Sequence, residues 1–116
     1  MQRIHPHYNT YTRLLFIEPT KGKSAVPVLD EYTMRMKAAW DVRLVSEHSW
    51  RGFHVCVCGA WRDNKDHYVG RGFGIVTNSL CLHYLAWHRE EIPPDQLKIV
   101  ASLTLDVVMP TPAELY

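Results

Sequence analysis

The stretch RGFHVCVCGAW, residues 51–61, alternates two kinds of side chain. His54, Cys56 and Cys58 occupy every second position, and apolar residues stand between them. Because successive side chains of a β-strand point to opposite faces, this pattern predicts a strand with the histidine and both cysteines on one face. That face is either part of a metal site or an ordinary buried surface, since cysteine is among the residue types most often found in protein interiors.

The spacing of the two cysteines constrains any metal site. Side chains two positions apart on a straight strand are separated by about 6.6 Å along the chain. Two thiolates that share a zinc ion must be closer, because each bonds the ion at about 2.3 Å. The strand must therefore curl at Cys58, and Gly59 directly after it permits such a curl. The sequence CVCG is thus compatible with a metal-binding turn.

Two histidines downstream supply further ligand types. The segment IVTNSLCLHYLAWHREEIPP predicts a helix over 79–91 that Pro93 and Pro94 end. His83 and His88 lie five positions apart, which is about 140° of rotation on an ideal helix. They can converge if the helix tightens or frays near its end. The spacing H-x₄-H lies within the range used by zinc modules.

We therefore expect a closed, four-coordinate zinc site that stabilises the fold and is not catalytic. Its predicted ligands are Cys56, Cys58, His83 and His88.

Two alternatives remain open at this stage. A second zinc site would combine Cys56 and Cys58 with Cys81 and one histidine, either His67 or His83. The other alternative is a metal-free structural domain, in which the thiols and imidazoles belong to the core.

The composition indicates one folded domain over 1–116, because 47% apolar residues in 116 positions can form a real core. We expect peripheral tails at 1–11 and 107–116 and a candidate metal-binding ββα core at 52–91. The expected class is α+β: a small antiparallel hairpin or sheet packed by two main helices, as in treble-clef-like or ββα zinc-stabilised units.

The expected elements follow from periodicity and turn residues. A strand is predicted at 12–17, and residues 52–69 are predicted to form a hairpin whose return strand is 67–69. The strongest helical period runs over 28–47, and a short helix is predicted at 94–103. Thr111, Pro112 and Glu114 have the spacing of a helix cap.

Charge and targeting patterns narrow the functional classes. Thirteen basic and twelve acidic residues give a net charge of +1, which does not by itself recruit nucleic acid or anionic lipid. Neither a signal segment nor a membrane span is evident, and an odd number of cysteines suits a reducing compartment. We expect a cytoplasmic, non-enzymatic module that binds a macromolecular partner, protein rather than nucleic acid. Its anchors would be the tryptophans around the cluster, Trp50, Trp61 and Trp87.

A second pattern overlaps the first. Asp66 and His67 at the end of a predicted strand precede a glycine-rich loop, then Asn78, then a helix ending in His88. This order resembles the ββα-metal fold of HNH nucleases. The resemblance implies that His67 is the general base that activates water, that Asn78 orients it, and that His88 binds a catalytic divalent metal together with Asp66.

The resemblance covers residues 54–89 only. The cysteine pair is C-x-C rather than C-x-x-C, and the helix carries the single Cys81 in place of a second pair. His88 also falls one residue late in the helix register, which turns it by about 100°. A helix cap accounts for Asn78 equally well.

Overall fold

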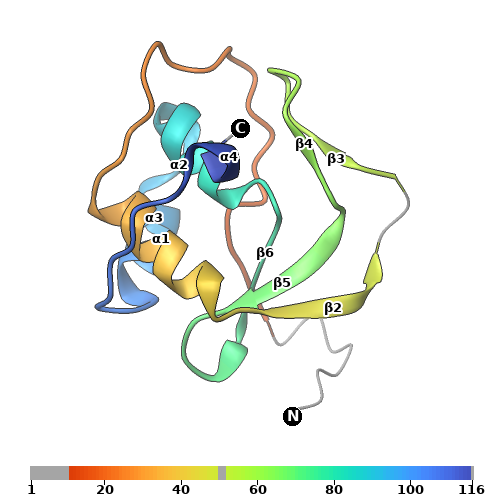
Figure 1. The fold of residues 1–116 in the computed structure, drawn as a ribbon, viewed down its shortest axis with the longest axis vertical. Helices are drawn as coiled ribbons and strands as arrows, with labels where there is room; N and C mark the ends of the chain where they lie inside the picture. The colour runs from red at the N-terminus through yellow and green to blue at the C-terminus, as the bar shows by residue number, and fades with distance from the viewer. Residues whose placement is uncertain (1–10, 50–51, 116) are drawn as a thin grey trace.

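Helix α2 (Cys81–Trp87) occupies the centre of the core, and every one of its seven residues is buried. A helix that is apolar around most of its circumference must be covered on all sides. The extended segment before helix α1 covers one side, where the backbone amides of Ser24 and Val28 donate to the carbonyls of Trp87 and Ala86. The computed structural model describes residues 11–49 and 52–115. In Figure 1, α2 lies beside α4, and the orange segment before α1 runs around its outer side.

The elements follow one another as helices and short strands. In chain order they are β1 (Thr12–Arg13), α1 (Glu31–Asp41), β2 (Leu44–Ser49), β3 (His54–Val55), β4 (Trp61–Arg62), β5 (Lys65–Val69), the 3₁₀ helix η2 (Arg71–Phe73), β6 (Ile75–Thr77), α2, the 3₁₀ helix η3 (Arg89–Glu91), α3 (Pro94–Ser102) and α4 (Pro112–Leu115). This content confirms the predicted α+β class.

The main sheet has the strand order β1-β6-β5-β2. Strand β5 pairs antiparallel with both β2 and β6, while β1 adds to β6 in parallel, so the sheet is mixed. The predicted strand 12–17 is reduced to Thr12–Arg13. Leu14 and Leu15 leave the strand and enter the core, with Leu15 at a positive φ of 59°.

The predicted hairpin 52–69 is wrong in its return strand. Strand β3 pairs with β4, at His54↔Arg62 and Val55↔Trp61, and forms a separate two-stranded sheet. Residues 67–69 belong to β5 in the main sheet, as Figure 1 shows. Four of the five β5 residues are buried, which suits a central strand with partners on both edges better than one limb of an exposed hairpin.

The long helix predicted over 28–47 is also wrong at its C-terminal end. Asp30 caps α1, its carboxylate accepting from the Thr33 amide, but the helix stops at Asp41. The next residues form β2, in register with β5 at Leu44↔Tyr68. Pairing with a central strand outweighs the helical spacing of the apolar residues, because helical period is a local signal and sheet pairing is not.

The helix predicted over 79–91 divides into two pieces. Helix α2 ends at Trp87, and His88 leaves the helical conformation with φ −127° and ψ 34° before η3 begins. The two prolines lie beyond this end, and Pro94 begins α3, where its missing amide is tolerated. Helix α3 spans Pro94–Ser102 and confirms the helix predicted at 94–103.

The C-terminal segment combines exposed and buried residues. Val107, Val108 and Met109 are exposed, as a peripheral segment would have them. The predicted cap at Thr111 is confirmed: its amide and hydroxyl both donate to the Glu114 carboxylate, at 2.8 and 2.9 Å. Leu115, by contrast, packs into the core. The predicted N-terminal tail lies outside the described residues except for Tyr11.

None of the described helices has the length and apolar character needed to cross a membrane.

Candidate metal centre

The chain turns sharply after β3, at the position of the predicted curl. The Cys56 amide donates to the Ala60 carbonyl at 2.8 Å, and the Gly59 amide donates to the Cys56 carbonyl at 2.9 Å. Gly59 has a φ of +96°, a conformation that side chains with a Cβ rarely adopt. We call residues 56–60 the cysteine turn. Strand β3 ends at Val55, so both cysteines lie in this turn and not in the strand. The turn directs both thiols toward the histidines of α2.

The two histidines approach the cysteine turn from α2. His83 lies inside the helix, whereas His88 is the residue at which the helix ends. Because His88 departs from helical backbone angles, the separation of an ideal helix does not apply to this pair. The two imidazole centroids are 5.1 Å apart.

Each cysteine sulfur of the group lies next to one histidine nitrogen. Sγ of Cys56 is 3.2 Å from Nε2 of His88, and Sγ of Cys58 is 3.2 Å from Nε2 of His83. All four ligand atoms lie within 4.8 Å of one another. Tetrahedral zinc with ordinary bond lengths separates its ligand atoms by about 3.4–3.8 Å. The group is therefore close enough to hold a metal ion.

The ring nitrogen of His83 that points away from the cysteines, Nδ1, has a backbone partner. Nδ1 of His83 lies 2.8 Å from the carbonyl oxygen of Leu115. A carbonyl only accepts, so the ring donates from Nδ1 and keeps its lone pair on Nε2, the atom that faces Cys58. Such a second hydrogen bond is typical of metal-binding histidines.

The outer nitrogen of His88 faces a carboxylate. Nδ1 of His88 is buried and makes no hydrogen bond to any part of the chain that the structure describes. The nearest Glu91 oxygen is 3.9 Å away. The Glu91 carboxylate instead accepts from the amide and hydroxyl of Thr20, at 2.8 Å each, and from the Lys21 amide at 3.3 Å.

Burial controls the protonation of the cluster. Burial lowers the pKa of both His83 and His88, so the imidazoles are neutral and able to bind a cation near neutral pH. Burial also raises the pKa of Cys56, with the neighbouring Cys58 thiol contributing. A cation among the four atoms would reverse that effect, because it stabilises thiolates.

Three other candidate ligands have different surroundings. Cys81 is completely buried in the core, and burial raises the pKa of its thiol to about 12. His54 shares the strand face of the cysteines, but its Nε2 lies 3.2 Å from the Tyr84 hydroxyl. His67 is buried between Arg43, whose Nε donates to Nδ1, and Asp63, which lies 3.1 Å from Nε2. Among the described residues, none of the three joins the four-ligand group.

The residues of the nuclease pattern are engaged separately. Both ring nitrogens of His67 have partners, which leaves no free lone pair to activate water. The Asn78 amide donates to the Leu15 carbonyl and accepts from the Leu80 amide, as a structural cap does. His88 lies in the four-ligand group, which in the described chain does not include Asp66.

Two neighbours of the four-ligand group, the Glu91 carboxylate and the Leu115 carbonyl, are not part of the predicted site. Glu91 was visible as an acid three residues after His88, and that spacing could have indicated it. The Leu115 carbonyl had no signal, because a backbone oxygen thirty-two positions from His83 is placed only by the fold.

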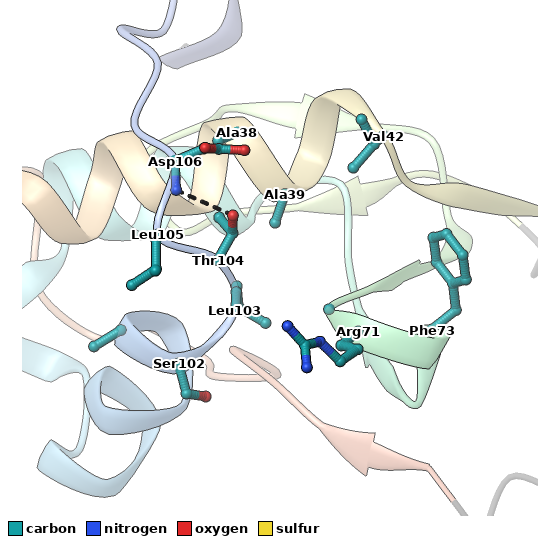
Figure 2. Close-up of a pocket in the computed structure, with 12 residues that line it drawn as sticks. Ala38, Ala39, Val42, Arg71, Phe73, Ser102, Leu103, Thr104, Leu105 and Asp106 are labelled. Carbon is teal, nitrogen blue, oxygen red and sulfur yellow. Dashed lines mark hydrogen bonds between the residues drawn. The ribbon is translucent and has the colours of Figure 1, made fainter.

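Two hollows of the described surface lie apart from these ligands. A groove of about 770 Å³ is lined mainly by small and aliphatic side chains of α1 and residues 101–106, with Arg71 projecting toward Leu103 (Figure 2). A smaller hollow of about 170 Å³ is lined by Glu31, Tyr32, Arg35 and Ala101. Neither contains a member of the four-ligand group, so neither places a substrate beside it.

Comparison with known proteins identified no relative: no family model, no curated protein and no solved structure matches the chain significantly. The fold and the site therefore carry the classification by themselves. They define a small α+β protein with a Cys₂His₂ group that could hold a metal ion.

Proposed function

We propose that Cys56, Cys58, His83 and His88 bind one zinc ion, which fastens the cysteine turn to helix α2. The chemistry of the donors supports zinc. Two thiolates and two imidazoles suit zinc, whereas magnesium and calcium prefer oxygen ligands. Four protein ligands leave no open position for substrate or water, so the ion has a structural role. The thiols must stay reduced to bind it, as an intracellular compartment would ensure.

The weakness of the β3–β4 sheet supports a structural role for the metal. Each of its strands has two residues, and an isolated two-stranded hairpin is marginally stable at best in water. Val55 and Val57, on either side of Cys56, are exposed. The proposed ion therefore adds an attachment to the limited apolar burial of this segment, which comes from Cys56 and Ala60, and its binding energy becomes folding energy.

The exposed side of this sheet supports partner binding. Phe53, Val55, Val57 and Trp61 are 66%, 60%, 59% and 57% exposed. We call these four residues the hairpin face. The rings of Phe53 and Trp61 are in edge contact, with centroids 4.8 Å apart. Aromatic side chains are common energetic anchors at interfaces, so we propose that this face binds a partner.

The chemistry of the hairpin face favours a protein as that partner. Its four members are uncharged, and the neighbouring Arg62 donates to the Ala113 carbonyl. Nucleic-acid affinity depends mainly on phosphate contacts, which apolar side chains do not provide. Four partly exposed side chains offer roughly 400–500 Å², less than the ~800 Å² per partner of a standard stable interface, which suits a transient complex.

The tryptophans predicted as anchors differ in position. Trp61 belongs to the hairpin face, whereas Trp87 is 5% exposed and packs in the core. Trp87 is thus excluded as a surface anchor. Trp50 lies outside the described residues.

The close approach of four zinc-type ligands is the observation that carries the proposal, and metal content tests it. We expect about one zinc per chain in protein purified without an affinity tag. A chelator should then remove the far-ultraviolet circular dichroism of the folded chain, because the proposed site is part of the fold. Metal-free protein whose spectrum is unchanged by chelator would contradict the proposal.

A further inference from the structure

The C-terminal segment, defined as residues 111–115, is attached at three points around the candidate metal centre. The Leu115 carbonyl accepts from His83, and the Leu115 side chain packs in the core. Glu114 forms an ion pair of 2.6 Å with Lys37 of α1. Arg62 of β4 donates to the Ala113 carbonyl at 3.1 Å. Helix α4 lies against α2 in consequence, as Figure 1 shows.

One of these attachments depends on which nitrogen of His83 carries the proton. With the proton on Nδ1, the ring donates to Leu115 and presents a lone pair to a metal from Nε2. With the proton on Nε2, the ring would donate to the Cys58 sulfur, 3.2 Å away. Nδ1 would then direct a lone pair at the Leu115 carbonyl, an arrangement of two acceptors that is unfavourable.

A metal ion removes that choice. Once Nε2 binds a cation it cannot carry a proton, so a neutral His83 must hold its proton on Nδ1. The bound ion also polarises the ring, which makes the Nδ1–H group a stronger donor to Leu115. The carbonyl in turn orients the ring and makes Nε2 a better ligand.

We propose that the C-terminal segment and the metal centre are energetically coupled through His83, with the Leu115 carbonyl as a positioning group. This inference rests on the proposed zinc site. Metal binding fastens the C-terminal segment, and docking of the segment strengthens metal binding. Because coupling between two binding events is reciprocal, each must favour the other by the same factor.

The first test removes the carbonyl. A chain ending at Glu114 should bind zinc about 10–100-fold more weakly than the full chain, the usual effect of losing an outer hydrogen-bond partner of a ligand. Competition with a chromophoric chelator measures this affinity. The absorption spectrum of the cobalt-substituted protein should also change, because His83 is no longer held in place. The control Val100→Ala, at a buried position in α3 that belongs neither to the four-ligand group nor to the C-terminal segment, should destabilise the fold but leave that spectrum unchanged.

The second test weakens the attachment of the C-terminal segment through a residue that does not contact the four ligands. Glu114→Ala removes the ion pair with Lys37 and the cap on Thr111. Asp41→Asn is the control, because Asp41 binds the same Lys37 ammonium at 2.6 Å but, among the described residues, forms no hydrogen bond or ion pair with the C-terminal segment. We expect Glu114→Ala to lower zinc affinity several-fold and to accelerate amide hydrogen exchange at 111–115 in the zinc-loaded protein. Asp41→Asn should do neither.

The outcomes separate the two proposals. Full-length protein that binds no zinc overturns both. Full-length protein that binds zinc, together with a truncated chain of unchanged affinity and cobalt spectrum, overturns the coupling alone. Should the truncated chain fail to fold, the comparison of Glu114→Ala with Asp41→Asn decides, and equal zinc affinities of those two variants overturn the coupling.

Discussion

Sγ of Cys56 and Nε2 of His88 lie 3.2 Å apart although thirty-two sequence positions separate the two residues. Each reaches this point at the end of a regular element: Cys56 follows β3 directly, and His88 is the residue that ends α2. Irregular backbone at both ends is what allows the side chains to meet. The site thus depends on where the strand and the helix stop.

Substituting Cys58 and Cys81 in turn should distinguish a metal-binding cysteine from a cysteine that only packs in the core. Cys58→Ser should weaken zinc binding by more than the roughly 10–100-fold expected for an outer hydrogen-bond partner, because a direct ligand is lost. Cys81→Ser should retain one zinc but lower the free energy of unfolding by about 1–3 kcal/mol, because a hydroxyl replaces a thiol in a fully buried position. Metal analysis and urea denaturation measure both effects. Loss of zinc from Cys81→Ser with retention in Cys58→Ser would reverse the assignment.

Gly59→Ala should destabilise the cysteine turn. The backbone of Gly59 has a φ of +96°, where an L residue with a Cβ is strained by about 1–2 kcal/mol even though nothing crowds the position. We expect a loss of that size in the free energy of unfolding and weaker zinc binding. Gly22→Ala is the matched control, since a Cβ there also meets nothing within 4 Å and the backbone is not in the left-handed region. Equal stability of the two variants would disprove the strain.

Stability should fall on acidification partly through His67. Burial lowers the pKa of His67, and the nearby Asp63 opposes this effect only in part. The unfolded chain therefore takes up a proton below about pH 6.5 that the folded chain resists. His67 stabilises the fold fully above that pH, and its contribution is lost as the pH falls toward the lowered pKa.

The comparison that isolates this effect is His67→Gln. The variant should have a shallower dependence of unfolding free energy on pH between about 7.5 and 5.5, measured by urea denaturation. The difference between the two slopes also removes the contribution of metal release at low pH, which both proteins share. Identical slopes would show that another group titrates.

The hairpin face should affect binding but not folding. The double substitution Phe53→Ser and Trp61→Ser should keep its zinc and alter stability by no more than about 0.5 kcal/mol for each exposed site. A photoreactive side chain at Val55 should form a discrete adduct in the host cell that the double substitution abolishes. Leu105→Ser is the control, because Leu105 is exposed but is not part of the hairpin face. Adduct formation that survives the double substitution would exclude this face.

Helix α1 shows why part of the fold was not predictable. Its apolar spacing is a local feature that predicts the helix, whereas the structure begins the helix only at Glu31, with Asp30 as its cap. The spacing continued to Leu44, yet residues 44–49 form β2 because β5 offers them a partner. The same competition separates residues 67–69 from the predicted hairpin 52–69. Local periodicity does not report which strand will be available for pairing.

The amino-acid sequence alone established the features that depend on near neighbours. These are the residue types suited to metal binding, the turn at Cys58 and Gly59, a helical segment that ends before Pro93, and the cap at Thr111. Tertiary structure alone decided the rest. It buried Cys81 and His67 away from the four-ligand group, and it brought the Leu115 carbonyl to His83. The physical reason is that turns and caps form between residues a few positions apart, whereas ligand selection depends on contacts between distant segments that form only when the whole core packs.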